Sequence, residues 1–170
     1  MVELLKPRRG SFLRPFGCGR FIKELLLGNG PYGSPHIDPA TGAPQADIFY
    51  QYKTSLSRAI AVDRATREEE RQARREKCTI SPEEIDRLTV KQLARIPYKA
   101  SGCTYHSFVV YFSNLQRLGW VEFTGREDPS AFQDHHPPGP PRKYYRLTPA
   151  GRVASDTTWS NPLFALYSGN

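Results

Sequence analysis

The feature that most constrains the fold of this chain is a change of period at Gly119. Before this glycine, residues 104–118 place apolar side chains at helical intervals, which predicts a helix with one buried face. That face consists of Phe108, Phe112 and Leu115. Directly after Gly119, residues 120–124 alternate in the manner of a strand. A helix that passes into a strand through a single glycine predicts an α+β fold.

A β-hairpin is expected after this helix. Residues 120–124 and 143–147 form its strands, with a turn at residues 125–129, and the long tip ends in a proline-rich stretch that cannot continue a strand ladder. Thr148-Pro149 then opens a short helix, with threonine as cap and proline in the first position. The tail from Trp159 to Asn170 is apolar enough to pack on the rest of the chain.

The first half of the chain predicts helices separated by a long loop. A buried helix is expected over residues 20–27, and residues 28–47 contain too many glycines and prolines for a regular element. A second helix then shows an apolar stripe, formed by Phe49, Tyr52, Leu56 and Ile60. It continues into the charged residues 64–77, which have no apolar face and are expected to project into solvent or fray.

Ser81-Pro82 is a strong helix start, because serine caps the helix and proline suits its first position. We expect a short helix over residues 82–88. Thr89 is interpreted as the cap of a separate helix over residues 90–96, which ends at Pro97.

Length and composition favour one domain with a large insertion. The chain has 170 residues, and its uninterrupted apolar runs are too short to span a membrane. The N-terminal charges follow the short apolar stretch, the reverse order of a secretory signal, so we expect a cytoplasmic protein, associated with the nucleoid in a bacterial or archaeal cell. The three cysteines are far apart and predict neither disulfides nor a zinc site.

Basic residues are concentrated in two parts of the chain. Residues 89–126 and 142–152 hold nine Lys or Arg and one acidic residue, a net charge of +8, although the whole chain carries only +7. Residues 1–28 carry +4, so the remainder is acidic. This asymmetry favours a surface that faces a polyanion.

Several short motifs occur in an order that resembles the winged helix-turn-helix of PadR-like and MarR-like transcriptional regulators. The resemblance covers about residues 89–152. Its motifs are Leu115 in the recognition helix, Gly119 at its end, Val121 in the first wing strand, and Leu147-Thr148-Pro149-Ala150-Gly151 after the second. The resemblance implies a winged helix-turn-helix over residues 81–156. Residues 1–28 would be an arm with the first helix, residues 29–80 a loop-plus-helix insertion, and residues 157–170 an aromatic tail.

The resemblance and the charge together predict double-stranded DNA as the partner. A helix fits the major groove, and a basic hairpin can follow phosphates. The residues expected to contact DNA form two sets. The first belongs to the recognition helix and the turn before it, and the second belongs to the wing. They are Lys99, Thr104, His106, Ser107, Asn114 and Arg117 for the first set, and Arg126, Arg142, Lys143 and Arg146 for the second.

We expect a homodimer, or a partner protein, bound through the stripe of Phe49, Tyr52, Leu56 and Ile60, because a small winged-helix core does not obviously cover it. The alternative is that the stripe packs within its own chain as a brace.

Other functional classes stay open. No catalytic constellation is apparent, so we expect no enzyme and no cofactor. His135-His136 lacks the spacing of a metal site, and Cys103 beside His106 lacks a third group to orient it. The alternatives to a transcriptional regulator are a winged helix that serves as a protein-interaction subunit of a nucleic-acid-processing assembly, and one that binds RNA.

Overall fold

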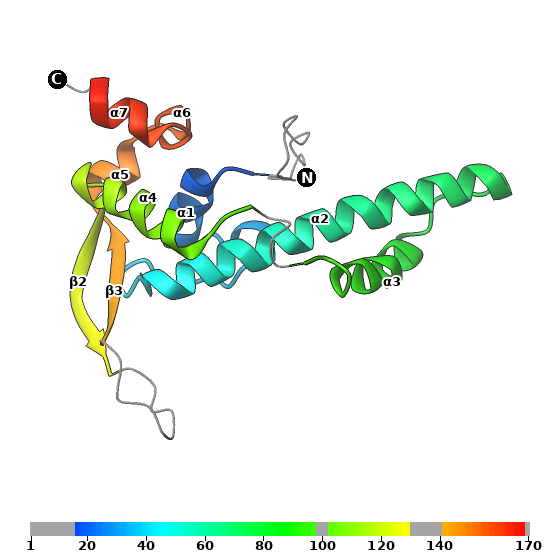
Figure 1. The fold of residues 1–170 in the computed structure, drawn as a ribbon, viewed down its shortest axis with the longest axis horizontal. Helices are drawn as coiled ribbons and strands as arrows, with labels where there is room; N and C mark the ends of the chain where they lie inside the picture. Colours follow the sequence, from blue (N-terminus) through cyan, green and yellow to red (C-terminus); the bar gives the residue numbers. More distant parts are fainter. Residues whose placement is uncertain (1–15, 98–101, 130–140, 169–170) are drawn as a thin grey trace. The chain divides into compact units, whose positions relative to one another are not determined.

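The computed structural model describes residues 16–97, 102–129 and 141–168, and its fold is α+β and mostly helical, with a small antiparallel sheet of three strands (Figure 1). The fold class expected from the sequence is confirmed at this level. The chain divides into two compact units. Of the described residues, the helical unit holds Phe16, 53–97 and 102–103, and the sheet unit holds 17–52, 104–129 and 141–168.

The sheet unit alternates short helices with three strands. Its elements in chain order are α1 (Cys18–Leu26), η1 (Pro31–Gly33), β1 (Ala43–Pro44), the first turns of α2 (Gln45–Glu76), α4 (Tyr105–Arg117), β2 (Val121–Asp128), β3 (Arg142–Leu147), α5 (Pro149–Val153), α6 (Asp156–Trp159) and α7 (Pro162–Ser168). The strand order is β1-β3-β2, so β3 lies in the middle of the sheet although it comes last in the chain.

The central strand β3 pairs with both of its neighbours in antiparallel register. Tyr145 stands opposite Ala43 of β1 and Phe123 of β2. The loop before β1 reaches β3 only because residue 42 is glycine: its φ is +69°, and a Cβ there would lie 1.9 Å from the carbonyl oxygen of Tyr145. This close approach adds the short strand β1 to the hairpin.

Aromatic side chains form the core of the sheet unit. Phe108 and Phe112 of α4 are stacked with ring centroids 5.9 Å apart, Phe49 packs against Phe108 at 5.2 Å, and Tyr145 meets Phe112 edge-on at 5.0 Å. These contacts join α4 to the start of α2 on one side and to β3 on the other. The tail is part of the same core, because Trp159 is fully buried.

The helical unit consists of the rest of α2 and of α3 (Pro82–Leu93), which lie side by side (Figure 1). Small or polar side chains of α2 are buried along this unit, at Ala65, Glu69 and Ala73, and α3 contributes Leu88. Glu69 accepts a hydrogen bond from the backbone N–H of Ser81 at 3.1 Å, which fixes the loop before α3. At the other end, Lys53 Nζ donates to the carbonyl oxygen of Cys103 at 3.0 Å.

Capping residues explain where several helices begin. Ser81, Thr104, Thr148 and Ser155 each accept a hydrogen bond from the backbone N–H three residues later, at Glu84, Ser107, Gly151 and Thr158. The expected starts at Ser81 and Thr148 are confirmed.

Thr89 is a different case, and its interpretation as a second cap is wrong. Its hydroxyl donates to the Ile85 carbonyl inside a continuous helix, α3, that runs to Leu93.

Two other expectations about boundaries are wrong. Residues 28–47 are not all loop, because η1 and β1 lie within them and α2 begins at Gln45. Residues 125–129 are not a simple turn, because β2 continues to Asp128. The register of β2 against β3 shifts at a bulge-like irregularity, where residues 124–126 of β2 stand opposite Tyr144 alone.

The apolar stripe at the start of α2 is buried inside the chain. Phe49, Tyr52, Leu56 and Ile60 are at most 8% exposed. The single chain thus buries the stripe, and binding of a second subunit or a partner protein through it stays a prediction. The unit boundaries also differ from the expected domains, because residues 29–52 belong to the sheet unit and residues 81–97 to the helical unit.

Candidate nucleic-acid interface

Helix α4 is held at both ends and along one face. Thr104 caps its start, accepting from Ser107 N at 3.2 Å. Phe108, Phe112 and Leu115 form the buried face, each at most 1% exposed, as the sequence predicts. The helix ends where Gly119, with a φ of +72°, reverses the chain into β2. The other faces of α4 therefore belong to a helix that is fixed at both ends.

The loop after β3 locks the C-terminal end of α4 in place. Thr148 Oγ1 donates to the Gly119 carbonyl oxygen and accepts from Gly151 N at 3.0 Å. Gly151 lies so close to the neighbouring backbone that a Cβ would come within 2.2 Å of the Trp120 carbonyl oxygen. Trp159 Nε1 donates to the Gly151 carbonyl oxygen at 2.9 Å, with its ring against Trp120. The threonine and glycine of the Leu147–Gly151 motif thus fix the helix end relative to the hairpin.

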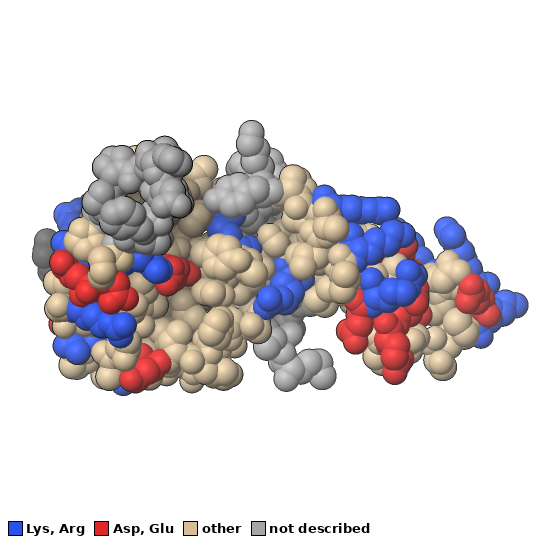
Figure 2. All heavy atoms as spheres, turned by 90° about the horizontal axis from the view of Figure 1, so that it is seen from below, with Lys and Arg blue, Asp and Glu red and all other residues tan. Residues whose placement is uncertain are grey.

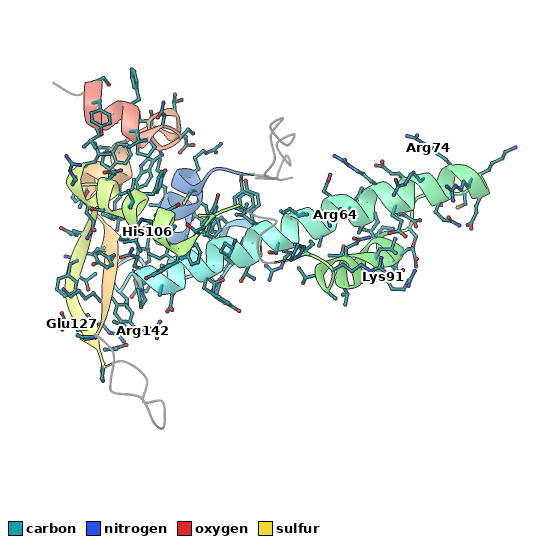
Figure 3. All side chains as sticks on the ribbon, in the orientation of Figure 1. Arg64, Arg74, Lys91, His106, Glu127 and Arg142 are labelled. Atoms are coloured by element: carbon teal, nitrogen blue, oxygen red, sulfur yellow. The ribbon has the colours of Figure 1, made fainter. Side chains whose placement is uncertain are left out.

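The α4 residues expected to contact DNA differ in their exposure and in the hydrogen bonds that they already make. Thr104, His106, Ser107 and Arg117 are exposed and Asn114 is half-buried. Thr104 and Ser107 are partly occupied by capping, since the two hydroxyls also bond each other at 3.0 Å. The side chains of His106 (Figure 3) and Arg117 make no hydrogen bond or ion pair with the part of the chain that the structure describes. Lys99 lies outside the described residues.

The exposed face of α4 also has an apolar part, of which the sequence pattern placed Val110 on the face and Tyr105 beside it, and missed Val109. Tyr105, Val109 and Val110 are 45%, 36% and 51% exposed, and Ser113 lies on the same exposed side. The signal was present, because positions one or two residues after Phe108 point away from the buried face at 100° per residue. The face thus combines hydroxyl, imidazole and methyl groups, which can meet base edges and thymine methyls.

The hairpin cations are largely paired with acids, which the sequence count of charge did not reveal. Arg146 Nε lies 3.0 Å from Glu122 Oε1, Arg142 forms an ion pair with Asp47, and Arg126 lies 3.6 Å from Asp128. Arginine and acidic side chains are accordingly mixed over the hairpin (Figures 2 and 3). The partners come from the facing strand, the start of α2 and the same strand respectively.

Aromatic rings take part in the same surface. The Arg126 guanidinium lies 4.2 Å from the centre of the Tyr144 ring, and Lys143 Nζ lies 5.5 Å from that of Phe123. Tyr144 Oη donates to Asp128 Oδ2 at 2.6 Å. This hydrogen bond lowers the pKa of Asp128 and raises that of Tyr144. The hairpin of the free protein is therefore a nearly balanced network with little excess positive charge.

The basic block inferred from the sequence is not one surface. Of its members, Lys91 and Arg95 belong to the helical unit, whereas Arg117, Arg126, Arg142, Lys143 and Arg146 belong to the sheet unit. The structure does bring α4 and the hairpin together, because Phe112 and Tyr145 join them. His135-His136 lies outside the described residues.

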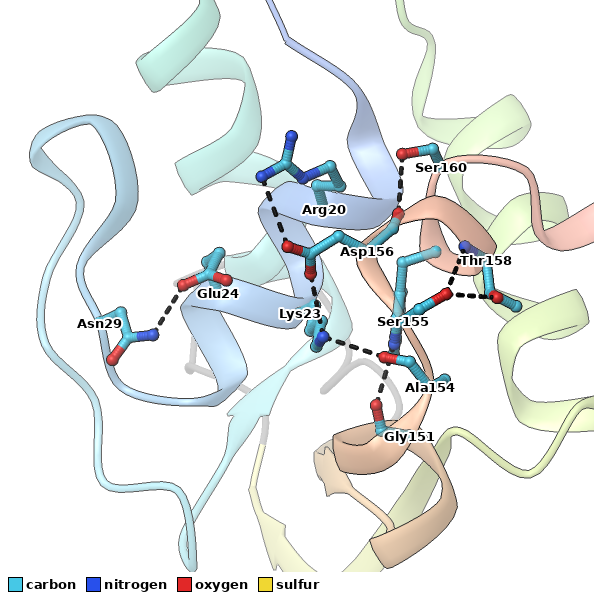
Figure 4. Close-up of polar contacts among 11 residues, drawn as sticks. Arg20, Lys23, Glu24, Asn29, Gly151, Ala154, Ser155, Asp156, Thr158 and Ser160 are labelled. Carbon is cyan, nitrogen blue, oxygen red and sulfur yellow. Dashed lines mark hydrogen bonds and ion pairs between the residues drawn. The ribbon is translucent and has the colours of Figure 1, made fainter. Parts of the chain in front are cut away.

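A second polar cluster lies in the sheet unit, between α1 and α6 (Figure 4). Lys23, only 9% exposed, donates to the Ala154 carbonyl oxygen and to Asp156 Oδ1, both at 3.0 Å. Arg20 reaches the other carboxylate oxygen of Asp156 at 3.7 Å. The hydrogen bond from Lys23 lowers the pKa of Asp156. Every charge in this cluster has a partner, so we interpret it as the clamp that holds the tail on α1.

Comparisons with protein families, with curated proteins and with solved structures find no match. Within the described ranges, no helix has the length and apolar character needed to cross a membrane. In the same ranges, no group of three or more His, Cys, Asp or Glu residues could hold a metal ion.

Proposed function

We propose that the sheet unit is a winged helix-turn-helix domain that binds double-stranded DNA sequence-specifically through α4, and that the protein regulates transcription. The order of elements supports this proposal. Helices α1, α2 and α4 precede a β-hairpin, and β1 completes the sheet. In this assignment α4 is the recognition helix, which enters the major groove.

The observation that carries the proposal is the exposed face of α4. It presents His106, Val110 and Arg117 on a helix whose opposite face is buried and whose two ends are fixed by hydrogen bonds. A helix held in this way can present base-reading groups without ordering them on binding, so less entropy is lost. His106 can hydrogen-bond a base edge, Val110 can contact a thymine methyl, and Arg117 can reach a phosphate.

The assignment gives the helical unit a defined place in the sequence. Residues 53–103 are inserted between the beginning of α2 and α4, where a helix-turn-helix has a short turn. In this proposal the helical unit is inserted between the second helix of the motif, the start of α2, and the recognition helix α4. The sequence pattern placed the insertion earlier, at residues 29–80, between the first and second helices.

The hairpin acts as the wing in this proposal. Its arginines are held by Glu122, Asp47 and Asp128 in the free protein, and they exchange these partners for DNA phosphates on binding. Such exposed ion pairs contribute little, about 0–1 kcal/mol each, so phosphates can compete for the guanidinium groups.

The test is binding of the full chain to duplex DNA, single-stranded DNA and RNA over a series of salt concentrations. Duplexes selected from a random pool should bind at least about a thousandfold more tightly than a scrambled duplex. The same affinity and salt slope for all three polymers would contradict the proposal and leave only non-specific charge binding. Preference for RNA would support the RNA-binding alternative.

A second candidate function is a protein-interaction subunit of a nucleic-acid-processing assembly. The observation that favours it is the exposed apolar surface of α7, where Leu163, Phe164 and Tyr167 are 46%, 68% and 77% exposed. If Phe164→Ser keeps sequence-specific duplex binding, the apolar surface of α7 is not needed to bind DNA, and the variant separates the two functions. A homodimer also stays a prediction, to be checked by light scattering.

A further inference from the structure

The second half of α2 carries five arginines on one side of the helix. These residues, named the arginine stripe below, are Arg64, Arg67, Arg71, Arg74 and Arg75. At 100° per residue they fall within an arc of about 100°, and at 1.5 Å per residue they extend over about 16 Å. Arg64 is half-buried and the others are exposed. The sequence suggested a solvated charged helix here, but the arginines are segregated onto one face.

The opposite side of α2 faces α3 and buries one acidic side chain, that of Glu69. Glu69 is 5% exposed and binds the backbone N–H of Ser81. Glu68, which lies next to the edge of the stripe, accepts a hydrogen bond from Gln92 of α3 at 3.2 Å. Ala65 and Ala73 are buried on this side as well. Packing against α3 therefore fixes the direction of the stripe, and Arg74 lies on the side of α2 away from α3 (Figure 3).

Among the described residues, one arginine of the stripe is in an ion pair, and the other four are not. Arg67 is paired with Asp63 at 3.2 Å. Arg64, Arg71, Arg74 and Arg75 form no ion pair with any residue that the structure describes. The stripe therefore contrasts with the hairpin, where three of the arginines are already neutralised.

We propose that the arginine stripe binds the phosphate backbone of double-stranded DNA as a sequence-independent contact, separate from α4. The identity of the polymer rests on the function proposed above, whereas the stripe itself does not depend on α4. Arginine binds phosphate through two parallel hydrogen bonds, and duplex DNA presents about one negative charge per 1.7 Å, so a stripe of this length can meet several phosphates.

Other polyanions fit the stripe less well. Proteins that bind single strands stack bases on aromatic rings, and residues 61–77 contain none. Helices that lie on membranes have a free apolar face opposite the basic one, whereas here the opposite face of α2 is packed on α3 through alanine and glutamate. A duplex backbone needs neither feature.

The test compares two double variants of the full chain that lose the same charge. Arg71→Gln with Arg74→Gln neutralises the stripe, and Lys91→Gln with Arg95→Gln neutralises two exposed cations outside it. Glutamine has nearly the helix propensity of arginine and lysine, so both should fold, as circular dichroism will check. The probe is a labelled duplex of random sequence, titrated over a salt series. We expect the stripe variant to lower the salt slope by about two, and the control to leave it nearly unchanged.

Equal losses in the two variants, or an unchanged slope in the stripe variant, would overturn the proposal. So would a wild type that binds vesicles of phosphatidylserine or single-stranded RNA through the stripe and ignores the duplex. His106→Ala, measured in parallel, separates the two proposals. If His106→Ala leaves site preference unchanged while the stripe variant has a lower salt slope, the proposed role of α4 is wrong and the proposal for the stripe is supported. If His106→Ala reduces site preference while the salt slope of the stripe variant is unchanged, only the proposal for the stripe is wrong.

Discussion

The ion pair between Arg146 and Glu122 leads to a prediction about affinity for DNA. If Arg146 leaves Glu122 to bind a phosphate, the free energy of that ion pair is lost on binding. In Glu122→Gln the arginine is free beforehand, so affinity for duplex DNA should rise. Glu127→Gln is a matched control, because Glu127 lies on the same strand and forms no ion pair with the described residues.

The magnitude follows from exposure. The side chains of Arg146 and Glu122 are 41% and 44% exposed, so the pair contributes at most about 1 kcal/mol. Because 1.4 kcal/mol corresponds to a factor of ten, Glu122→Gln should tighten duplex binding by roughly twofold to fivefold beyond the control. The free energy of unfolding should change by no more than about 1 kcal/mol, since both groups are at the surface.

Fluorescence anisotropy with one labelled duplex at fixed salt measures the effect, and thermal unfolding checks the fold. An equal gain in Glu122→Gln and Glu127→Gln would refute the reasoning, since it would show that only net charge matters. An unchanged affinity in Glu122→Gln would show that Arg146 does not move to a phosphate.

Three further predictions concern what holds the sheet unit together. Trp159→Ala should lower the free energy of unfolding by about 3–5 kcal/mol, because it removes a fully buried ring and its hydrogen bond to Gly151, and chemical denaturation will measure the loss. A change below about 1 kcal/mol would mean that the tail is not part of the core. Gly151→Ala should destabilise the same unit, because its Cβ would clash with the Trp120 carbonyl oxygen, and an unchanged melting temperature would contradict the close approach. Lys23 lowers the pKa of Asp156, so the stability from this contact is present above the usual aspartate pKa of about 3.9 and is lost as the pH falls through the lower folded-state pKa. The stability difference between wild type and Asp156→Asn should therefore shrink below about pH 4, and a difference independent of pH would count against the clamp.

Local chemistry made some of this structure predictable. The caps at Ser81 and Thr148, the buried face of α4 and the glycine at its end depend on neighbouring residues, and the structure agrees with each. The two strands of the hairpin follow from the same short-range patterns, although β2 is longer than expected because it absorbs an irregularity.

Contacts between distant residues account for what the sequence did not predict. Strand β1 exists because Ala43 pairs with Tyr145, about a hundred positions away, and two residues have no strand pattern of their own. The charged half of α2 is helical with α3 packed against it, through Glu69 and Leu88. The acids that neutralise the hairpin include Asp47, remote in sequence from its partner Arg142, so counting charges along the chain overestimated the positive surface.

The central claim is that α4 reads base pairs, and the most direct measurement is the ratio of affinities for a selected duplex and a scrambled one. His106→Ala with Val110→Ala should reduce this ratio while leaving affinity for the scrambled duplex almost unchanged. The reduction should correspond to about 1–3 kcal/mol for each good base contact. His36→Ala, a histidine outside α4 in the same unit, should leave the ratio intact. A ratio in the α4 variant equal to that of wild type would contradict the claim.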